Sequence, residues 1–200
     1  MEKEEILFNI KEEALKNHVP IIEDDSLEYI ANILKEKKPN KILEIGTAVG
    51  YSAINFSKYL VGEGAKVLTI EIKEQMYEKA LENISLMGLQ DKIEVINADA
   101  TKYLKNINEQ FDVVFIDAAK GQYLVFLEEA IRLCKIGGII IADNMLYRGR
   151  TLSDYNEHKH RTATNRLREY LVQMKEDKRL DSTLICLLYT SDAADDLTRV

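Results

Sequence analysis

The sequence has little of what interrupts or cross-links a chain: it holds two prolines, nine glycines, two cysteines and no tryptophan in 200 residues. So few prolines and glycines argue against long disordered linkers. The cysteines, Cys134 and Cys186, are too few for a disulfide framework, so a reducing compartment is expected. No run approaches the roughly 20 apolar residues that span a bilayer, and the charged residues 1–5 are not followed by the apolar segment of a signal peptide. These absences predict a cytoplasmic protein that does not associate with membranes.

The chain is acidic overall but carries one basic segment. Its formal net charge of −7 argues against indiscriminate binding of polyanions. Between Arg148 and Arg168, however, six Lys or Arg side chains stand against Asp154 and Glu157. The segment is either a solvated helix face with a loop or a surface that meets an anionic substrate, and the charge pattern leaves both readings open.

Short apolar runs alternate with amphipathic segments along the chain. Strands are predicted at 41–45, 66–70, 93–97, 111–116 and 138–142, and helices at 2–17, 26–37, 52–60, 73–87, 100–104 and 123–134. Ser26 is the predicted N-cap of the second helix. Strands that are apolar throughout are typical of a parallel sheet buried on both faces. The pattern therefore predicts an α/β fold: a doubly wound, Rossmann-like sheet in a single domain, residues 1–185, with N-terminal helices in 1–38.

The turn after the first predicted strand is the most informative motif. Glu44 lies one residue before the end of the strand, and Gly46 and Gly50 follow at the start of a helical segment. Ligands of doubly wound sheets bind at the carboxyl ends of the strands, and glycines let backbone approach them closely. A dinucleotide fingerprint needs three glycines, whereas an acidic residue before two glycines resembles motif I of S-adenosylmethionine-dependent methyltransferases. That cofactor has no pyrophosphate but carries a cationic amino-acid end.

Polar residues follow the next two predicted strands in a similar way. Glu71 stands about twenty residues beyond the first turn, where a carboxylate accepts hydrogen bonds from ribose hydroxyls. Ala98 and Asp99 follow the third strand and are placed to frame an adenine amino group. Each acid also has a structural reading, Glu71 as a favourable charge at a helix start and Asp99 as an N-cap.

Strands four and five end in oxygen-bearing side chains. Asp117 follows the fourth strand, and Asp143 with Asn144 follows the fifth. Neighbouring parallel strands would place these groups at one rim of the sheet. Two carboxylates and an amide oxygen suit Mg²⁺ or another divalent cation. Lys120 lies three residues beyond Asp117, where it could accept a proton if its surroundings lower its pKa.

Together these motifs resemble the cation-dependent class I O-methyltransferases, the group of the catechol and caffeoyl-CoA enzymes, over residues of about 18–170. The residues that carry the resemblance are Glu44, Gly46, Gly50, Tyr51, Ser52, Glu71, Ala98, Asp99, Asp117, Ala118, Ala119, Lys120, Asp143 and Asn144. It implies cofactor contacts from Ile22, Glu44, Gly46, Ser52, Glu71, Ala98, Asp99 and Asp117, and metal ligation by Asp117, Asp143 and Asn144. It also implies Lys120 as general base, with Asp117 facing the cofactor, and a homodimer.

Short pieces near residues 19–22, 143–149 and 166–171 look most like bacterial tRNA 5-hydroxyuridine methyltransferases. That likeness implies transfer of a methyl group to the wobble base, giving 5-methoxyuridine, with Arg148, Arg150 and Arg161 contacting the tRNA anticodon. The alternative acceptor is a small catechol-like or caffeoyl-CoA-like molecule. An alternative from another class is a regulatory module that binds the cofactor without catalysis.

The carboxyl-terminal segment departs from the family pattern. Residues 180–185 read as the approach to a sixth strand, after which the family continues through a Gly-Asp-Gly turn into a final antiparallel strand. Residues 186–200 contain no glycine and no strand pattern, and read as foreign sequence or as a divergent natural tail. We expect the final strand to be missing or replaced and residues beyond about 186 to be poorly ordered. The exposed edge of the sheet should then make the protein less stable than a full-length relative.

Overall fold

The fold is built on a five-stranded parallel sheet. The computed structural model describes residues 2–145, 151 and 158–185. In spatial order the strands are β3 (Ile93–Asn97), β2 (Lys66–Glu71), β1 (Lys41–Ile45), β4 (Phe111–Ile116) and β5 (Cys134–Ala142). The order reverses beside β1, so β1 and β4 flank the switch point at which doubly wound sheets bind ligands. The α/β class and the Rossmann-like sheet predicted from the sequence are confirmed.

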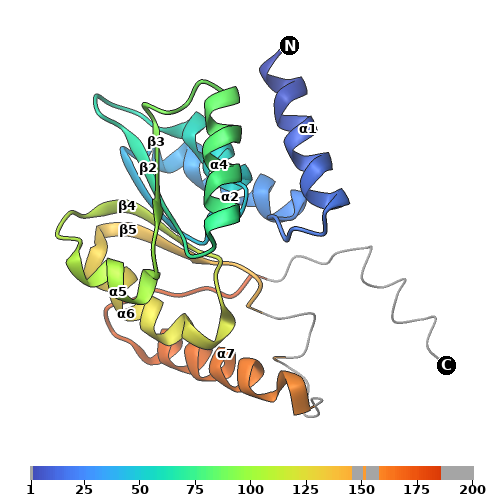
Figure 1. Cartoon of the computed structure of the whole chain (residues 1–200). Coiled ribbons are helices and arrows are strands. Elements are labelled where there is room, and N and C mark those ends of the chain that lie inside the picture. Colours follow the sequence, from blue (N-terminus) through green and yellow to red (C-terminus); the bar gives the residue numbers. More distant parts are fainter. Residues whose placement is uncertain (1, 146–150, 152–157, 186–200) are drawn as a thin grey trace.

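Helices cover both faces of this sheet (Figure 1). They are α1 (Lys3–Lys16), α2 (Asp24–Lys37), α3 (Tyr51–Phe56), α4 (Glu74–Leu86), α5 (Ala100–Tyr103), α6 (Tyr123–Leu133) and α7 (His158–Glu176), with short 3-10 turns η1 (Ser57–Tyr59), η2 (Leu104–Asn106) and η3 (Lys120–Gln122). The first four helices pack on one face, and α6 and α7 pack on the other.

Alternate residues of the central strands feed two separate cores. On β4, Val113 and Phe115 point into the core beneath α1 to α4, whereas Val114 and Ile116 point into the core beneath α6 and α7. All four are almost fully buried. This is the two-sided burial that continuous apolar strands predict.

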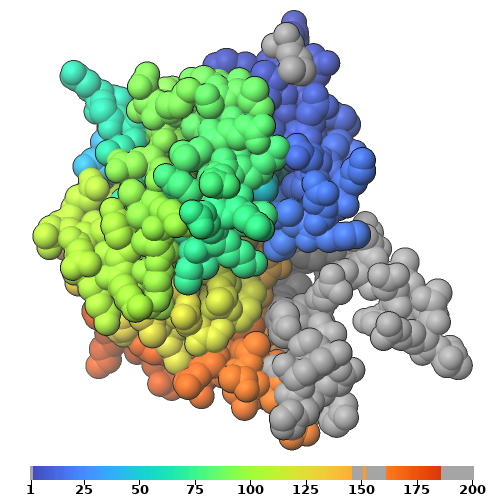
Figure 2. All heavy atoms as spheres, in the orientation of Figure 1, coloured from blue at the N-terminus to red at the C-terminus, as the bar shows by residue number. Residues whose placement is uncertain are grey.

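The N-terminal helices are tied to the rest of the domain by charge as well as by packing. Lys11 of α1 pairs with Asp24 of α2 at 2.6 Å, and Glu13 of α1 pairs with Lys79 of α4 at 3.0 Å. The space-filling view shows the N-terminal segment lying against α4 (Figure 2). These contacts position the segment between α1 and α2, which contains Ile22.

Two details of the sequence prediction were wrong. The second helix begins at Asp24 rather than after Ser26, and Ser26 is buried in its first turn; Asp24 is held there by Lys11 and suits the helix start electrostatically. The fifth strand begins at Cys134, although its regular pairing resumes only at Ile139 after an irregularity. Helix α7 overlaps the basic segment, for which a helix face was one of the two readings, although its bounds were not predicted. Residues 181–185, read as the approach to a sixth strand, form no strand themselves.

β5 is an edge strand within the described part of the chain, since its only partner there is β4. Leu184 and Ile185 are exposed. The predicted disorder of residues 186–200 lies outside the described residues, and the domain limits stay predictions. In the ranges 2–145 and 158–185, no helix is long and apolar enough to cross a bilayer.

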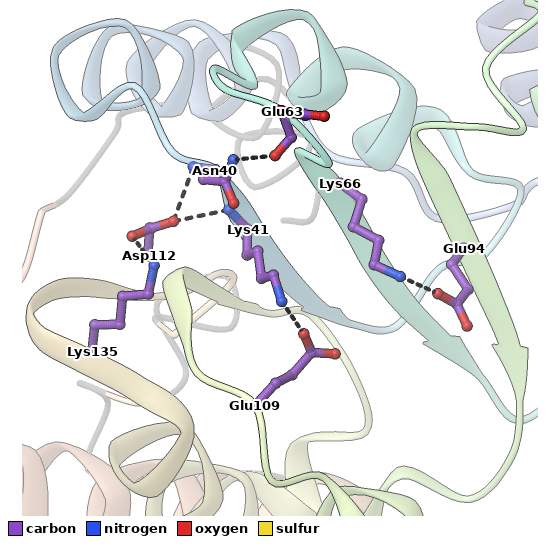
Figure 3. Close-up of polar contacts among 8 residues, drawn as sticks. All are labelled: Asn40, Lys41, Glu63, Lys66, Glu94, Glu109, Asp112 and Lys135. Carbon is purple, nitrogen blue, oxygen red and sulfur yellow. Dashed lines mark hydrogen bonds and ion pairs between the residues drawn. The ribbon is translucent and has the colours of Figure 1, made fainter.

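Figure 3 shows a set of ion pairs and hydrogen bonds at the amino ends of the strands. Asp112 accepts hydrogen bonds from the backbone N–H groups of Asn40 (2.9 Å) and Lys41 (2.8 Å), and from Nζ of Lys135 (2.7 Å). Although burial opposes it, this set of donors holds the pKa of Asp112 below its usual value. One carboxylate thereby joins β1, β4 and β5 at the end opposite the predicted site.

Replacing Asp112 with alanine is expected to lower the free energy of unfolding by roughly 2 kcal/mol, because partly buried N–H donors lose their acceptor. The depressed pKa means that this stabilisation is present above the pKa of the unfolded carboxyl and is lost as the pH falls through the folded value. Urea denaturation at pH 7 and pH 3 measures it. The control is Glu94→Gln, which breaks an exposed pair with Lys66 and should cost under about 1 kcal/mol; equal losses in both variants would contradict the prediction.

Candidate active site at the carboxyl ends of the strands

Backbone hydrogen bonds continue past the ends of the strands and draw the functional turns together. The N–H groups of Gly46, Asp117 and Asp143 donate to Ile70 (3.0 Å), Ile45 (2.9 Å) and Ile116 (3.0 Å), the last residues of regular pairing on neighbouring strands. Ala98 donates to Glu71 in the same way, at 3.0 Å. The residues predicted from separate motifs therefore lie along one rim, in the order of the strands.

Gly46 allows the first turn to approach β4. Its φ is +103°, and a Cβ at this position would lie 2.0 Å from the backbone oxygen of Asp117. Only glycine fits such an approach. The glycine that was predicted to make room for a ligand also makes room for the turn that carries Asp117.

Glu71 fastens the first turn to the end of β2. Its Oε2 accepts from the N–H of Ala48 and its Oε1 from the N–H of Lys73, both at 2.9 Å. Its side chain is largely buried. Each carboxylate oxygen has a second lone pair, so the predicted contact with ribose hydroxyls is compatible with this geometry.

Glu44 is a carboxylate buried without a counter-charge. It is fully inaccessible, and its Oε2 accepts a 2.6 Å hydrogen bond from Thr69, whose hydroxyl also lies 2.6 Å from that of Thr47. Oε1 has no hydrogen-bond partner among the described residues. The pKa of Glu44 is raised to about 7, chiefly by burial. The hydroxyls of Ser52 and Thr69 lower this pKa, whereas the negative charges of Asp117 and Glu71 raise it. An orphaned oxygen beside the first turn suits the cationic end of the predicted cofactor.

The Glu44→Gln variant is expected to gain stability relative to wild type as the pH rises. A carboxyl whose folded pKa is raised contributes stability below its unfolded pKa and loses it as the pH rises through about 7. The stability difference between the variant and the wild type should therefore shift by roughly 3 kcal/mol between pH 5 and pH 8. Chemical denaturation of both ligand-free proteins at four pH values measures it. Parallel pH curves would show that Glu44 is ionised normally in the folded chain.

The residues predicted to contact the adenine and the methionine end lie on separate elements. Asp99 caps α5, since its side chain accepts hydrogen bonds from the N–H (3.0 Å) and the hydroxyl (2.7 Å) of Thr101. Of its two predicted roles, the N-cap is therefore the one seen in the structure. Ser52 lies in the first turn of α3, and Ile22 is buried in the core that joins α1, α2 and α3. Their contacts with a cofactor stay predictions.

Lys120 lies in a corner formed by the ends of β4 and β5. Its Nζ is 3.6 Å from Oδ1 of Asp117, and it donates to the Asp143 backbone oxygen at 3.3 Å and to the Tyr123 hydroxyl at 2.9 Å. Only 18% of its side chain is exposed. Burial lowers the pKa of Lys120, against the opposing effect of Asp117 and Asp143. The lysine is therefore better suited to accept a proton than a surface lysine is.

Two carboxylates share this corner. Burial, and then the nearby charge of Asp117, raise the pKa of Asp143 to about 6. Asn144 follows with a left-handed φ of 57° and donates through its N–H to Oδ1 of Asp143 at 2.7 Å. Like charges in a partly buried corner, next to an amide oxygen, suit a hard divalent cation. Among the described residues, no group of three or more His, Cys, Asp and Glu could hold a metal, so the fit depends on the amide of Asn144 and on water completing the shell.

The basic segment joins the site at its ends. Thr151 is buried, and its hydroxyl donates to the Met145 backbone oxygen at 2.8 Å; Nε of Arg168 on α7 donates to the Thr151 backbone oxygen at 2.9 Å. Met145 and Thr151, the described residues on either side of 146–150, are therefore in contact directly after Asn144. Arg148 and Arg150, predicted to contact substrate, lie outside the described residues, and Arg161 lies exposed on α7.

Three residues of the site were missed by sequence reasoning: Thr69, Tyr123 and Thr151. Tyr123 carried a weak signal, because it stands three residues after Lys120 at a helix start, where side chains three apart meet. Thr69 and Thr151 carried none, since their partners lie on other elements.

Known proteins resemble this chain in sequence and in fold. The sequence profile of the O-methyltransferase family matches residues 1–192. The tapetum-specific methyltransferase 1 of Arabidopsis thaliana is 30% identical over 76% of this chain and 69% of its own length. The catechol O-methyltransferase of Mycobacterium tuberculosis is 33% identical over 72% of this chain and 64% of its own length. The alignment with bovine catechol O-methyltransferase spans about half of that enzyme, 47% of its length.

Solved structures give the same result. The O-methyltransferase of Bacillus cereus in complex with SAH, the demethylated cofactor, superimposes with a TM-score of 0.78 at 25% identity, covering 87% of this chain and 80% of that one. Caffeoyl-CoA and catechol O-methyltransferases both occur among the curated relatives. A profile match over nearly the whole chain, a shared fold and the turn built from Glu44 and Gly46 agree with one another. The chain belongs to the family of S-adenosylmethionine-dependent, catechol- and caffeoyl-CoA-like O-methyltransferases.

Proposed function

We propose that the chain transfers a methyl group from S-adenosylmethionine to a hydroxyl in a reaction that needs Mg²⁺ or a similar cation. The observation that carries the proposal is the corner in which Lys120 lies 3.6 Å from Asp117 and 3.3 Å from the Asp143 backbone. A sulfonium-to-oxygen transfer needs an aligned acceptor and somewhere for its proton to go. This corner supplies both functions beside the glycine turn.

Each residue of the rim has a role in this proposal. Asp117, Asp143 and Asn144 would hold the cation, which when bound lowers the pKa of the acceptor hydroxyl and fixes its direction. Lys120 Nζ would accept the hydroxyl proton as the oxygen takes the methyl group. On the cofactor side, Glu44, Gly46, Ser52 and Ile22 would line the methionine end, Glu71 the ribose, and Ala98 with Asp99 the adenine; Asp117 would also face the cofactor.

For the acceptor we propose 5-hydroxyuridine at the wobble position of tRNA. Its hydroxyl and adjacent carbonyl can chelate a cation as a catechol does. The support is charge and sequence position: Arg148 and Arg150 follow Asn144 within six residues in an otherwise acidic protein. An exposed anticodon base needs no duplex opening. The names of the catechol and caffeoyl-CoA relatives favour a second candidate, a small catechol-like acceptor.

Release of S-adenosylhomocysteine distinguishes the candidates. Purified protein is incubated with tRNA carrying 5-hydroxyuridine, with catechol or with caffeoyl-CoA, in Mg²⁺ or in chelator, and nucleosides are identified by mass spectrometry. The proposal expects 5-methoxyuridine that disappears with chelator. A double replacement of Arg148 and Arg150 by alanine should raise KM for tRNA and leave catechol turnover unchanged, with Lys175→Ala on α7 as matched control.

Other outcomes would reject parts of the proposal. Turnover on catechol alone would replace the tRNA acceptor, and turnover unaffected by chelator would remove the cation. Cofactor binding without turnover on any acceptor would favour a non-catalytic binding module. The homodimer is likewise a proposal, tested by light scattering of the purified protein.

A further inference from the structure

The Tyr123 side chain is buried behind the catalytic corner, and its hydroxyl is the meeting point of three groups. It lies 2.9 Å from Nζ of Lys120, 3.1 Å from the Asp143 backbone oxygen and 3.4 Å from the Ile116 backbone oxygen. A phenol has one proton to donate. If the Tyr123 proton is donated to the Asp143 backbone oxygen, the nearer of the two carbonyls, the Tyr123 oxygen accepts a hydrogen bond from the Lys120 amine.

The position of this hydroxyl is set by the surrounding core. Tyr123 is the first residue of α6 and is 0% exposed. Its ring packs edge-on against Tyr170 of α7, with centroids 5.6 Å apart and planes at 71°. Nζ of Lys120 also lies 4.9 Å from the Tyr123 ring centroid, within the range of a cation–π contact. Two helices thus hold one oxygen in place beneath the lysine.

Lys120 needs such a support because its own side chain is flexible. A lysine side chain has four rotatable bonds, and ordering it costs rotamer entropy. Besides the bond to Tyr123, its Nζ lies 3.6 Å from Asp117 and donates a 3.3 Å bond to the Asp143 backbone oxygen. The Tyr123 hydroxyl makes the shortest contact of the three.

We infer that Tyr123 is a positioning residue, whose hydroxyl holds the Lys120 amine between the ends of β4 and β5, and that α7 supports it through Tyr170. The inference depends on the proposed role of Lys120 as proton acceptor. Because Tyr123 also bonds the Asp143 backbone, one side chain sets the spacing between the lysine and the strand end that carries Asp143 and Asn144.

The test is Tyr123→Phe, which keeps the ring and removes the hydroxyl. We expect kcat to fall about 10- to 100-fold, since small misplacements of a reacting group cost that much, with KM for S-adenosylmethionine and for the acceptor unchanged within about twofold. A readout independent of turnover is the rate at which an amine-acylating reagent labels Lys120, followed by peptide mass spectrometry. That rate should rise severalfold as the amine is released.

Tyr29→Phe is the matched control. It makes the same change at an exposed tyrosine of α2, and no contact at the corner is given up. Its kcat and labelling rate should match wild type. In a Lys120→Gln background, Tyr123→Phe is expected to have no further effect on residual kcat, because residues that act through one another are not additive.

The failures of the two proposals are distinguishable. If Lys120→Gln keeps wild-type kcat, the proposed role of Lys120 is wrong and this inference is overturned with it. If Lys120→Gln is inactive but Tyr123→Phe matches wild type in kcat and in labelling, the inference alone is overturned. The inference is also overturned if Tyr123→Phe lowers kcat in the Lys120→Gln background as well. The same holds if Tyr123→Phe lowers kcat without changing the labelling rate of Lys120.

Discussion

Asp143→Asn is expected to lower kcat by about a thousandfold or more while changing the affinity for S-adenosylmethionine only a few-fold. The change removes one of the two carboxylates proposed to hold the cation, and a cation contributes several kcal/mol to such a transition state. Calorimetric titration with Mg²⁺ should show weaker binding in the same variant. Initial rates at saturating cofactor, with Mg²⁺ varied, separate lost affinity from lost turnover.

A loss of folding would not account for this result. In metal-free protein, Asp143→Asn removes a like charge beside Asp117, so the free energy of unfolding should be equal to or above that of wild type. Asp91→Asn, an exposed acid before β3, is the matched control and should keep wild-type turnover. Retention of more than a tenth of the activity by Asp143→Asn would remove Asp143 from the proposed cation site.

Gly46→Ala is expected to damage both stability and cofactor binding. Its Cβ would lie 2.0 Å from the Asp117 backbone oxygen, and a φ of +103° is strained for alanine. We expect a loss of roughly 3 kcal/mol or more in the free energy of unfolding. The affinity for the cofactor should fall at least 100-fold, because the first turn and the turn carrying Asp117 must move apart.

The control for this variant is Gly64→Ala. Gly64 also has a left-handed φ, +65°, but a Cβ there meets nothing within 4 Å, so the cost should be only about 1–2 kcal/mol of backbone strain. Denaturation midpoints and cofactor titrations of both variants give the comparison. Equal stability losses would mean that the close approach to Asp117 contributes nothing.

The sheet and the positions of its rim residues were largely predictable from the sequence. Apolar strands buried on both faces leave few alternatives, and four of the five predicted strands agree with the structure to within one residue. Parallel pairing then brings the residues after each strand to one edge, so Asp117 and Asp143 could be placed together without coordinates. Helix α7 was harder, because its many charged residues leave a thin apolar stripe that includes Leu167 and Tyr170.

What the sequence could not predict depends on contacts between distant elements. The start of α2 was wrong because Lys11, on another helix, pairs with Asp24. Thr69 supports Glu44 across two strands, and nothing in the spacing of either residue indicates this. Asp99 was predictable, because its capping of α5 is a contact between neighbours in the sequence and was one of the two readings of the motif.

The Thr151–Met145 hydrogen bond has a consequence for how the specificity of this enzyme family can diversify. It joins the two residues that flank 146–150, and the Thr151 end of this contact is buried. Arg168 of α7 adds a hydrogen bond to the Thr151 backbone oxygen. The stretch between can then be lengthened or exchanged at a small entropic cost, because closure entropy grows only slowly with length. Under the proposed function, in which this stretch contacts the acceptor, acceptor preference could then change while Asp143 and Asn144 stay the same.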